Sequence, residues 1–464
     1  MMSQLEEISG PYRFPLLGHT PYLWGGFPSG KIHRIAEERG GLWRVQLPNS
    51  TFIAITRFQY MDELCDESRF EKTIHGGQIE LKRVVKDGLF TAHTEDESWG
   101  RAHRILLPGF GSKAMGSYLP VMNSVSRLLV ETWGGSGQKA IDVNRDMTMV
   151  SLEIIGVCGF DYHFADFEHY RESPFVKKMK SMFYDANLST VFSESWMNIL
   201  FFSKYRRGIT TEVMTGVVDN VIEKRLARPE DYAHKKDFLN LMLEGSDSRD
   251  DSKLDAKNIR YQLITFLAAG YETTASLLGL CIYYLLKHEE VMAKARERVD
   301  EIFDANGDAD LSFKDIGQMG YLKMMIHETL RLWPTGSGFF LRPKAKTTLQ
   351  EKYEVTEEDV FFISLPGLHR DKEIWGSRPE VFDPENFSPE NSKARPRNAF
   401  KPFGNGMRAC IGQHFAITEV QVILAFLLRN FELIDYTNYQ LRIDESVTLK
   451  ARHFYLKVNS RQRG

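Results

Sequence analysis

The chain contains few cysteines for its length. Only four occur in 464 residues, namely Cys65, Cys158, Cys281 and Cys410, and none of them belongs to a Cys-x-x-Cys pair. This spacing suits neither a zinc site nor a disulfide framework. Isolated cysteines that stay reduced are typical of a cytoplasmic protein. We therefore expect a cytoplasmic location.

The sequence also lacks a charge excess. Its 59 Lys and Arg residues nearly balance 62 Asp and Glu residues, which gives a formal charge of −3. Nucleic-acid-binding proteins usually carry a basic excess, so nucleic acid is not an expected partner. The 35 glycines follow no collagen-like period, and the first residues lack the basic flank and apolar run of a signal peptide. With 42% hydrophobic residues, the composition is that of a folded globular protein rather than a disordered one.

One long apolar stretch, from about 259 to 286, raises the question of a membrane span. It contains Arg260 and Glu272, and a charge in the middle of a span is costly in lipid. A helix that is apolar all round apart from one polar turn is more typical of the central helix of a large core. We therefore expect no membrane anchor. Gly270 costs this helix about 1 kcal/mol relative to Ala, so a specific reason for it is expected.

The patterning of apolar residues predicts a mainly α chain. Proline, glycine and aromatic residues indicate an irregular N-terminal segment over 1–30 and a coil over 366–403. Short β-type runs indicate a small β region around 41–56, with a turn at Pro48-Asn49, and around 353–364. Helical periodicity covers 121–133, 147–159, 211–226, 237–243, 259–286, 319–333 and 413–430. Because no repeat or linker interrupts the chain, we expect a single domain over residues 1–464.

The most informative segment is 403–412, which reads F-G-N-G-M-R-A-C-I-G. A dinucleotide-binding loop needs a hydrophobic strand directly before its glycines, and 398–402 is not one. A buried structural cysteine would not account for the glycines and the arginine around Cys410. A thiolate ligand to a heme iron would account for both the glycines and the arginine. Gly404 and Gly406 would let the backbone approach a flat macrocycle, and Arg408 could pair with a heme propionate. The start of the following helix would stabilise the negative sulfur.

This segment resembles the heme-binding signature of the cytochrome P450 family, F-x-x-G-x-R-x-C-x-G, with Phe403, Gly406, Arg408, Cys410 and Gly412 at its specified positions. Segments 65–70, 258–262 and 369–372 look similar to the heme domains of fatty-acid hydroxylases that are fused to a flavin reductase. The resemblance covers nearly the whole chain. It implies a single-domain P450 fold, with heme b between the long central helix and the cysteine loop. It also implies that Cys410 is the axial ligand of the heme iron.

A second motif, A-G-Y-E-T-T at 269–274, lies inside the long apolar helix. An acid beside threonines could simply form a solvated face. The resemblance instead implies that Glu272 and Thr273 are an acid–alcohol pair that delivers protons for dioxygen activation. It also implies that Ala269 lines the substrate pocket and that Gly270 lets the backbone pass close to the ligand. Tyr271 departs from the His or Asp that family members often carry at this position.

A third motif, Glu328-x-x-Arg331, differs from the zinc motif H-E-x-x-H because arginine cannot ligate a metal. By spacing alone it could be a surface ion pair. The resemblance implies a buried structural pair that an arginine of F-x-P-E-R-F usually completes. Here that segment, 382–387, reads F-D-P-E-N-F, so Asn386 replaces the arginine and alters the network.

Further positions follow from the same resemblance. Trp99-x-x-x-His103 could be an ordinary core pair, and in the family this motif contacts a heme propionate. Phe90 matches the aromatic residue that stands over the heme, and Gly336 lies where a roomier pocket wall is expected. Placing Pro48 on the family's hairpin proline puts Ser50 and Ala54 where an Arg and a Tyr hold a fatty-acid carboxylate. Neither residue supplies a charge, although Arg44 or Arg57 on the same hairpin could substitute.

The function implied is a heme-thiolate monooxygenase that inserts one oxygen atom of O2 into a fatty acid or a similar small lipophilic compound. Alternatives are a tailoring oxygenase of a neutral specialised metabolite, an H2O2-driven peroxygenase and, in another class, a heme-thiolate redox or gas sensor. The Glu272-Thr273 pair speaks against the last two.

The chain contains no flavin- or NADPH-binding stretch after the heme signature. Electrons are therefore expected from NADPH through the FAD and FMN of a reductase, either a separate protein or missing fused domains. Five basic residues and no acidic ones occur between 393 and 408, namely Lys393, Arg395, Arg397, Lys401 and Arg408. They form either a solvated face or a surface that attracts an acidic electron donor.

Overall fold

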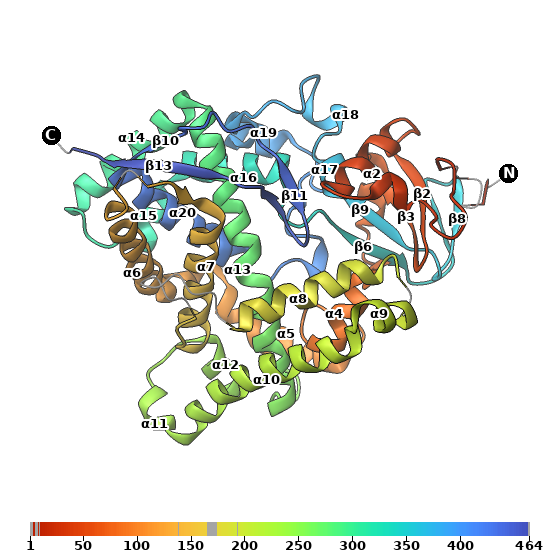
Figure 1. Cartoon of the computed structure of the whole chain (residues 1–464), viewed down its shortest axis with the longest axis horizontal. Helices are drawn as coiled ribbons and strands as arrows, with labels where there is room; N and C mark the ends of the chain where they lie inside the picture. Colours follow the sequence, from red (N-terminus) through yellow and green to blue (C-terminus); the bar gives the residue numbers. More distant parts are fainter. Residues whose placement is uncertain are drawn as a thin grey trace.

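The computed structural model describes residues 3–4, 8, 10–137, 139–164, 174–192 and 194–462. Helices make up most of this part of the chain, and the larger sheet lies at one end, on the right in Figure 1. The prediction of a mainly α protein with a small β region is therefore confirmed.

The helices that were expected from periodicity are all present, most with longer bounds. They are α6 (Met115–Gly134), α7 (Val143–Phe160), α10 (Ser203–Ala227), α12 (Phe238–Glu244), α13 (Ala256–Lys287), α16 (Gly320–Leu332) and α20 (Gln413–Asn430). Further helices are α3 (Phe58–Leu64), α4 (Gly77–Val85), α5 (Glu97–Phe110), α8 (Pro174–Ser189), α9 (Glu194–Phe201), α11 (Pro229–Tyr232), α14 (Glu289–Asn306) and α15 (Phe313–Gln318).

Two segments that were expected to be irregular contain helices. The N-terminal segment forms α1 (Thr20–Leu23) and α2 (Pro28–Glu37), and the coil over 366–403 contains α17 (Leu365–Leu368), α18 (Lys372–Trp375), the 3-10 turn η3 (Pro384–Phe387) and α19 (Pro389–Ala394). Proline stands in the first turn of α1, α2, α17, η3 and α19. A proline there costs nothing, because its missing N–H would have no helical partner. Proline content alone was thus a misleading sign of coil.

The larger sheet has five strands in the order β2-β3-β9-β6-β4. These strands are β2 (Leu42–Leu47), β3 (Ser50–Ile55), β9 (Phe361–Ser364), β6 (Gly338–Pro343) and β4 (Phe70–Thr73). The predicted hairpin is confirmed, since Leu47 pairs with Ser50 on either side of the turn. The two predicted parts of the β region meet in this sheet, because β3 pairs in parallel with β9.

Smaller sheets complete the β structure. β1 (Ser3–Gln4), β8 (Tyr353–Val355) and β7 (Thr347–Leu349) form one, and β10 (Phe431–Ile434), β13 (Tyr455–Ser460) and β5 (Ile141–Asp142) another. β11 (Ile443–Glu445) and β12 (Leu449–Ala451) form a two-stranded hairpin.

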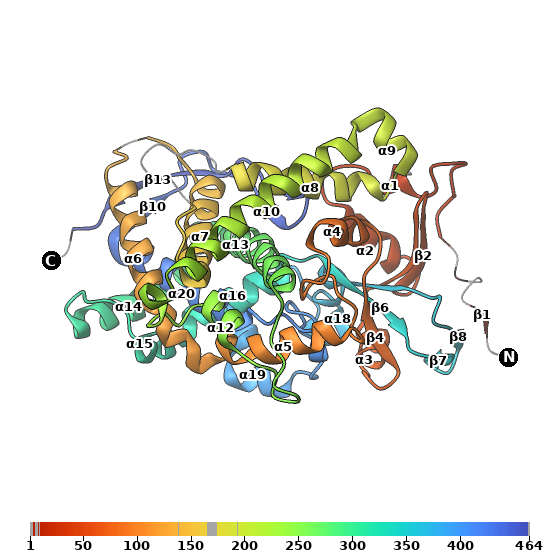
Figure 2. The ribbon, with the colours of Figure 1, turned by 90° about the horizontal axis from the view of Figure 1, so that it is seen from below.

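The central helix α13 is the core helix that the sequence predicted. Its first turn is capped by Asp255, whose side chain accepts a hydrogen bond from the Asn258 N–H. In Figure 2, α8, α9 and α10 form a layer on one side of α13, and α5 and α19 lie on the opposite side. Among the described helices, α13 alone is long and apolar enough to cross a membrane by length and composition, and most of it is buried inside the protein.

Gly270 packs closely against α7, and its expected approach to a ligand stays a prediction. A Cβ atom at this position would lie 3.0 Å from Cγ1 of Ile155 on α7. This separation is tighter than ordinary van der Waals contact, so a side chain at Gly270 would push the two helices apart. The glycine therefore allows close packing of α13 against α7.

Candidate active site

The residues around Cys410 form a tight loop directly before α20. The Cys410 N–H donates to the Phe403 carbonyl oxygen at 2.7 Å and closes a turn. Within it Gly404 (φ 83°) and Gly406 (φ 58°) adopt left-handed backbone conformations, which glycine reaches without steric cost. These glycines are therefore needed for the shape of the loop itself.

The cysteine loop rests on the segment that includes Cys65 and Glu67. Glu67 Oε1 accepts a hydrogen bond from the Met407 N–H at 2.8 Å, and Asn405 Nδ2 donates to the Cys65 carbonyl oxygen at 3.1 Å. A Cβ atom at Gly406 would collide with the Glu67 carboxylate. The similarity of segment 65–70 to family members thus has a structural cause that sequence reasoning did not find.

Cys410 combines an exposed side chain with a desolvated sulfur. The side chain is accessible to solvent, yet burial raises the pKa of its thiol, while a hydrogen bond from the Gly412 N–H and the charge of Lys72 partly lower it. The sulfur therefore faces accessible space inside the protein. A thiol in this position loses its proton when it coordinates a metal cation.

The polar turn of α13 contributes a second exposed group. Ala269 is exposed and Thr273 is partly exposed, although most of this helix is buried. Thr273 Oγ1 donates to the Ala269 carbonyl oxygen at 2.9 Å. The next residue, Thr274, donates in the same way to Gly270 but is buried. The space beside α13 therefore opens at Ala269 and Thr273.

Glu272 precedes Thr273 in sequence, but its carboxylate forms a hydrogen bond on a different side of α13 from the Thr273 hydroxyl. Its Oε1 atom accepts a hydrogen bond from Lys450 Nζ of β12 at 3.0 Å, in an ion pair whose side chains are 11% and 27% exposed. Successive residues of a helix point about 100° apart, so the carboxylate and the Thr273 hydroxyl face different neighbours. Sequence reasoning missed Lys450, because no local pattern links residue 272 to residue 450.

Arg408 holds the loop that positions Phe90. Its Nη1 atom donates to the Ala92 carbonyl oxygen at 2.9 Å, and Nη2 donates to the Leu89 carbonyl oxygen at 3.1 Å. The Phe90 ring is 37% exposed, with Lys72 Nζ 4.9 Å from its centroid. Phe90 therefore lies near Lys72 of β4 and Arg408 of the cysteine loop, and its expected place over a heme stays a prediction.

Lys72, His103 and Arg408 form a cluster of basic side chains, in which His103 and Arg408 contact Trp99 and Lys72 contacts Phe90. His103 stacks on Trp99 with ring centroids 4.9 Å apart, and the Arg408 guanidinium lies 4.6 Å from the Trp99 centroid. Burial and the charge of Arg408 lower the pKa of His103, and they lower that of Lys72 to about 7. Burial lowers the pKa of Arg408 to about 10.

No acidic side chain among the described residues contacts this basic cluster directly, although the charges of Glu95, Asp96 and Glu71 raise the pKa of Arg408. Within the described part of the chain, Lys72, His103 and Arg408 form no ion pair with a carboxylate. Buried cations without an anion are costly, and the propionates of a heme would supply that anion. Sequence reasoning found Trp99, His103 and Arg408 but missed Lys72, because a single lysine in a four-residue strand gives no pattern.

The Glu328–Arg331 pair is buried, as the resemblance implied. Arg331 Nε lies 2.7 Å from Glu328 Oε2, and the two side chains are 1% and 0% exposed. Asn386 Nδ2 donates to Glu328 Oε1 at 3.1 Å, and Arg395, which directly follows α19, donates to the Asn386 carbonyl oxygen. The charge of Glu328 also raises the pKa of Arg395, which burial lowers to about 10. Asn386 thus keeps its place in the network, and Arg395 supplies the missing positive charge nearby.

The hairpin positions offer no carboxylate anchor. Ser50 is 7% exposed and Ala54 is fully buried. Arg57 is already paired, with Glu37 at 2.8 Å and Asp371 at 3.2 Å. Gly336, by contrast, is exposed and has open space where a side chain would stand.

The residues present fit a heme. Among the described residues, no group of three or more His, Cys, Asp or Glu side chains could hold a metal ion, so a metal at Cys410 would need its other ligands from a macrocycle. The exposed, desolvated Cys410 sulfur suits the metal, and the unpaired basic cluster suits the acidic edge of the macrocycle.

Comparison with known proteins agrees with this geometry. The family model described as cytochrome P450 matches residues 8–458. The chain is 36% identical over 461 residues to bifunctional cytochrome P450/NADPH–P450 reductase 1 of Bacillus subtilis, covering 99% of this chain and 43% of that protein. It is 34% identical over 462 residues to a self-sufficient cytochrome P450 monooxygenase of Phanerodontia chrysosporium, covering 98% of this chain and 43% of that protein. The chain thus spans less than half the length of these relatives. Because the family model matches nearly the full length of the chain, the chain belongs to the cytochrome P450 family.

Proposed function

We propose that this protein binds heme b through Cys410 and inserts one oxygen atom of O2 into a C–H bond of a small lipophilic substrate. The observation that carries the proposal is the exposed but desolvated Cys410 sulfur, which accepts the Gly412 N–H at the start of α20. When bound, the heme supplies the chemistry of dioxygen activation, and a thiolate ligand favours O–O cleavage.

The chain's own residues would hold the heme in a fixed orientation. Lys72 and Arg408 would bind the propionates, with Trp99 and His103 stacked beside them. Phe403 and Ile411 pack against the main core on the protein side of the loop. These contacts anchor the loop on one side, so that the Cys410 sulfur stays directed toward the accessible space.

Thr273 and Glu272 would bind and transfer protons. The Thr273 hydroxyl lies at the open side of α13 and can exchange its hydrogen bond to Ala269 for one to a bound molecule. Protons from the solvent would reach Glu272 by way of Lys450, which is the more exposed member of this ion pair. Protons would therefore reach Glu272 from the β11–β12 hairpin, and Thr273 would hold a proton at the open side of α13.

The residues expected to line the substrate site are apolar, and the hairpin positions Ser50 and Ala54 supply no charge for a carboxylate. Phe90, Ala269 and Gly336 provide exposed apolar surface and open space, whereas Ser50 and Ala54 are buried and uncharged. A neutral or bulky lipophilic compound therefore fits at least as well as a long-chain fatty acid. Free fatty acids would bind, but weakly.

Electrons would come from NADPH through a flavin reductase. The names of the relatives include such a reductase, fused to the P450 portion that this chain matches. Of the five basic residues between 393 and 408, Lys393 and Arg397 are exposed, whereas Arg395 packs over Trp375 and Phe387. The surface that could attract an acidic donor is therefore smaller than the sequence indicated.

The experiment that tests this proposal supplies the purified, heme-loaded protein with a flavin reductase, NADPH and isotopically labelled O2. A panel of lipophilic compounds is screened for binding by the change in the heme spectrum. Oxygen label in a product, formed in step with NADPH consumption, supports monooxygenation. Product formed only with H2O2, or binding without any product from the whole panel, contradicts it and favours a peroxygenase or a sensor.

A further inference from the structure

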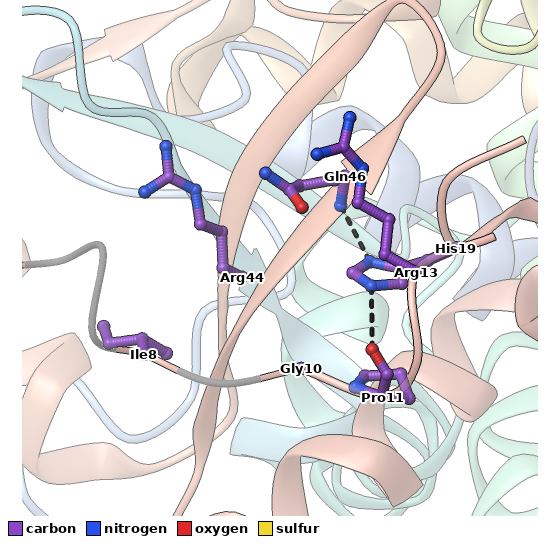
Figure 3. Close-up of a pocket in the computed structure, with 7 residues that line it drawn as sticks. All are labelled: Ile8, Gly10, Pro11, Arg13, His19, Arg44 and Gln46. Carbon is purple, nitrogen blue, oxygen red and sulfur yellow. Dashed lines mark hydrogen bonds between the residues drawn. The ribbon is translucent and has the colours of Figure 1, made fainter. Parts of the chain in front are cut away.

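A pocket of about 290 Å³ lies at the edge of the larger sheet, away from the residues of the active site. It is lined by Ile8, Gly10, Pro11, Arg13, His19, Arg44 and Gln46. Figure 3 shows that these residues come from the N-terminal segment and from β2, which is an edge strand. The function proposed above uses none of these residues.

The pocket is positively charged. Among the residues that the structure describes, its lining contains two arginines and no acidic residue. Within the part of the chain that the structure describes, neither Arg13 nor Arg44 forms an ion pair. The Nε atom of Arg44 is buried without a hydrogen-bond partner. A buried guanidinium donor without an acceptor is costly, and an oxyanion would remove that cost.

His19 forms part of the pocket wall, where hydrogen bonds hold its uncharged imidazole in place. This side chain is 2% exposed, and its Nδ1 atom accepts a hydrogen bond from the Gln46 N–H at 3.0 Å. Its Nε2–H then donates to the Pro11 carbonyl oxygen at 3.2 Å. Burial and the charge of Arg13 lower the pKa of His19. The imidazole thus fixes the N-terminal segment to β2, while the two arginines remain available.

The pocket is separate from the substrate site. Arg44 and Gln46 alternate along β2 with Trp43 and Val45, which are both fully buried in a hydrophobic cluster. Because successive side chains of a strand point to opposite faces, the arginine faces away from that cluster. Arg44 is therefore not a substitute for the missing carboxylate anchor at Ser50 and Ala54.

We propose that this pocket binds a phosphate group, held between Arg13 and Arg44 with the Gln46 side chain between them. Figure 3 shows the Gln46 amide between the two guanidinium groups. A phosphate group presents three or more acceptor oxygens and nearly two negative charges, so it can bind both arginines at once and more strongly than a singly charged carboxylate. The source is either free phosphate or the phosphoryl group of a small metabolite. Binding would join the N-terminal segment more firmly to β2.

The test measures binding to the purified, heme-loaded protein in a phosphate-free buffer at constant ionic strength. Inorganic phosphate, glycerol 3-phosphate and acetate are titrated by calorimetry, and the unfolding temperature is followed in parallel. The variants are Arg44→Gln and Arg13→Gln, and the matched control is Arg378→Gln, which changes an exposed arginine outside the pocket. Arg13 is itself exposed, so its variant is expected to fold even if Arg44→Gln does not.

We expect phosphate or the phosphomonoester to bind and to raise the unfolding temperature in the wild type and in Arg378→Gln. Tighter binding of glycerol 3-phosphate would identify a phosphorylated metabolite as the source, and tighter binding of inorganic phosphate would identify the free ion. Loss of one charge-assisted contact should weaken binding about 10- to 150-fold in each pocket variant. Equal binding by Arg13→Gln and wild type, equal binding of acetate, or no binding of either phosphate compound would overturn the proposal.

Discussion

Lys450 Nζ lies 3.0 Å from Glu272 Oε1, so an ion pair connects the C-terminal β11–β12 hairpin to the polar turn of the central helix. Lys450 also lines a pocket of about 410 Å³, together with Asn144, Asp444, Ala451, Arg452 and His453. The lysine thus stands between that pocket and a largely buried carboxylate. The two residues are 178 positions apart, so their contact depends on the packing of the hairpin against α13.

Replacing Lys450 by Met should weaken both stability and proton supply. The Glu272 carboxylate would lose its charged partner while remaining mostly buried, which costs about 1–3 kcal/mol of unfolding free energy. Product formed per NADPH should fall as well. Lys450→Arg is the matched control, because it keeps the charge. Wild-type urea unfolding and wild-type coupling in Lys450→Met would show that Glu272 does not depend on this partner.

Thr273→Val should uncouple NADPH consumption from product formation. The substitution keeps the shape of the side chain but removes the hydroxyl on the open side of α13, so the proton step loses its donor. The measurement is product and H2O2 formed per NADPH. Thr274→Val removes an equivalent hydroxyl that is buried on the same helix, and it should leave this ratio near that of the wild type. The same ratio in all three proteins would refute the role of Thr273.

Breaking the buried Glu328–Arg331 pair should be far more costly than breaking an exposed pair of similar spacing. Arg331→Met leaves a buried carboxylate without its main partner and should lower the unfolding free energy by about 3–5 kcal/mol. Arg298 and Glu301 also stand three residues apart, but their side chains are 41% and 54% exposed. Arg298→Met should therefore cost about 0–1 kcal/mol. Similar urea midpoints for the two variants would contradict the structural role of the buried pair.

The sequence predicted most of the helical core because the apolar residues on the buried face of a helix recur with the helical period. The bounds of α20 agree with the expected 413–430, since a loop and a strand limit it on both sides. At α13 the apolar pattern missed the polar first turn, which Asp255 caps from outside the apolar run. The short helices α1, α2, α17 and α19 were missed because proline signals a helix start as readily as a coil.

In the site, too, the residues that belong to local sequence patterns were predicted, and those that depend on tertiary contacts were not. Cys410, Arg408 and Thr273 belong to local motifs and could be found from the sequence. Lys72 and Lys450 could not, because each acts through a contact made only in the folded chain. Asn386 was identified as a departure from the family, but the compensation by Arg395 depends on the packing of α19.

Fatty-acid binding should not depend on the carboxylate. Without a charged anchor at Ser50 or Ala54, palmitate lacks a contact worth about 1.5–3 kcal/mol. Palmitate and its methyl ester should therefore bind with similar affinity, as measured by the shift of the heme absorption band. Tighter binding of the free acid, lost in Arg44→Gln or Arg57→Gln, would restore an anchored fatty-acid substrate and contradict this account.

The most direct test of the central claim is the absorption spectrum of the reduced, CO-bound protein. Wild-type protein and Cys65→Ser, which changes a cysteine beside the loop without removing the backbone carbonyl that supports it, should show the long-wavelength Soret band of thiolate-ligated heme. Cys410→Ser should lose that band together with monooxygenase activity. A wild-type band at the shorter wavelength of thiol- or histidine-ligated heme, or a long-wavelength band retained in Cys410→Ser, would contradict the assignment of Cys410 as the heme ligand.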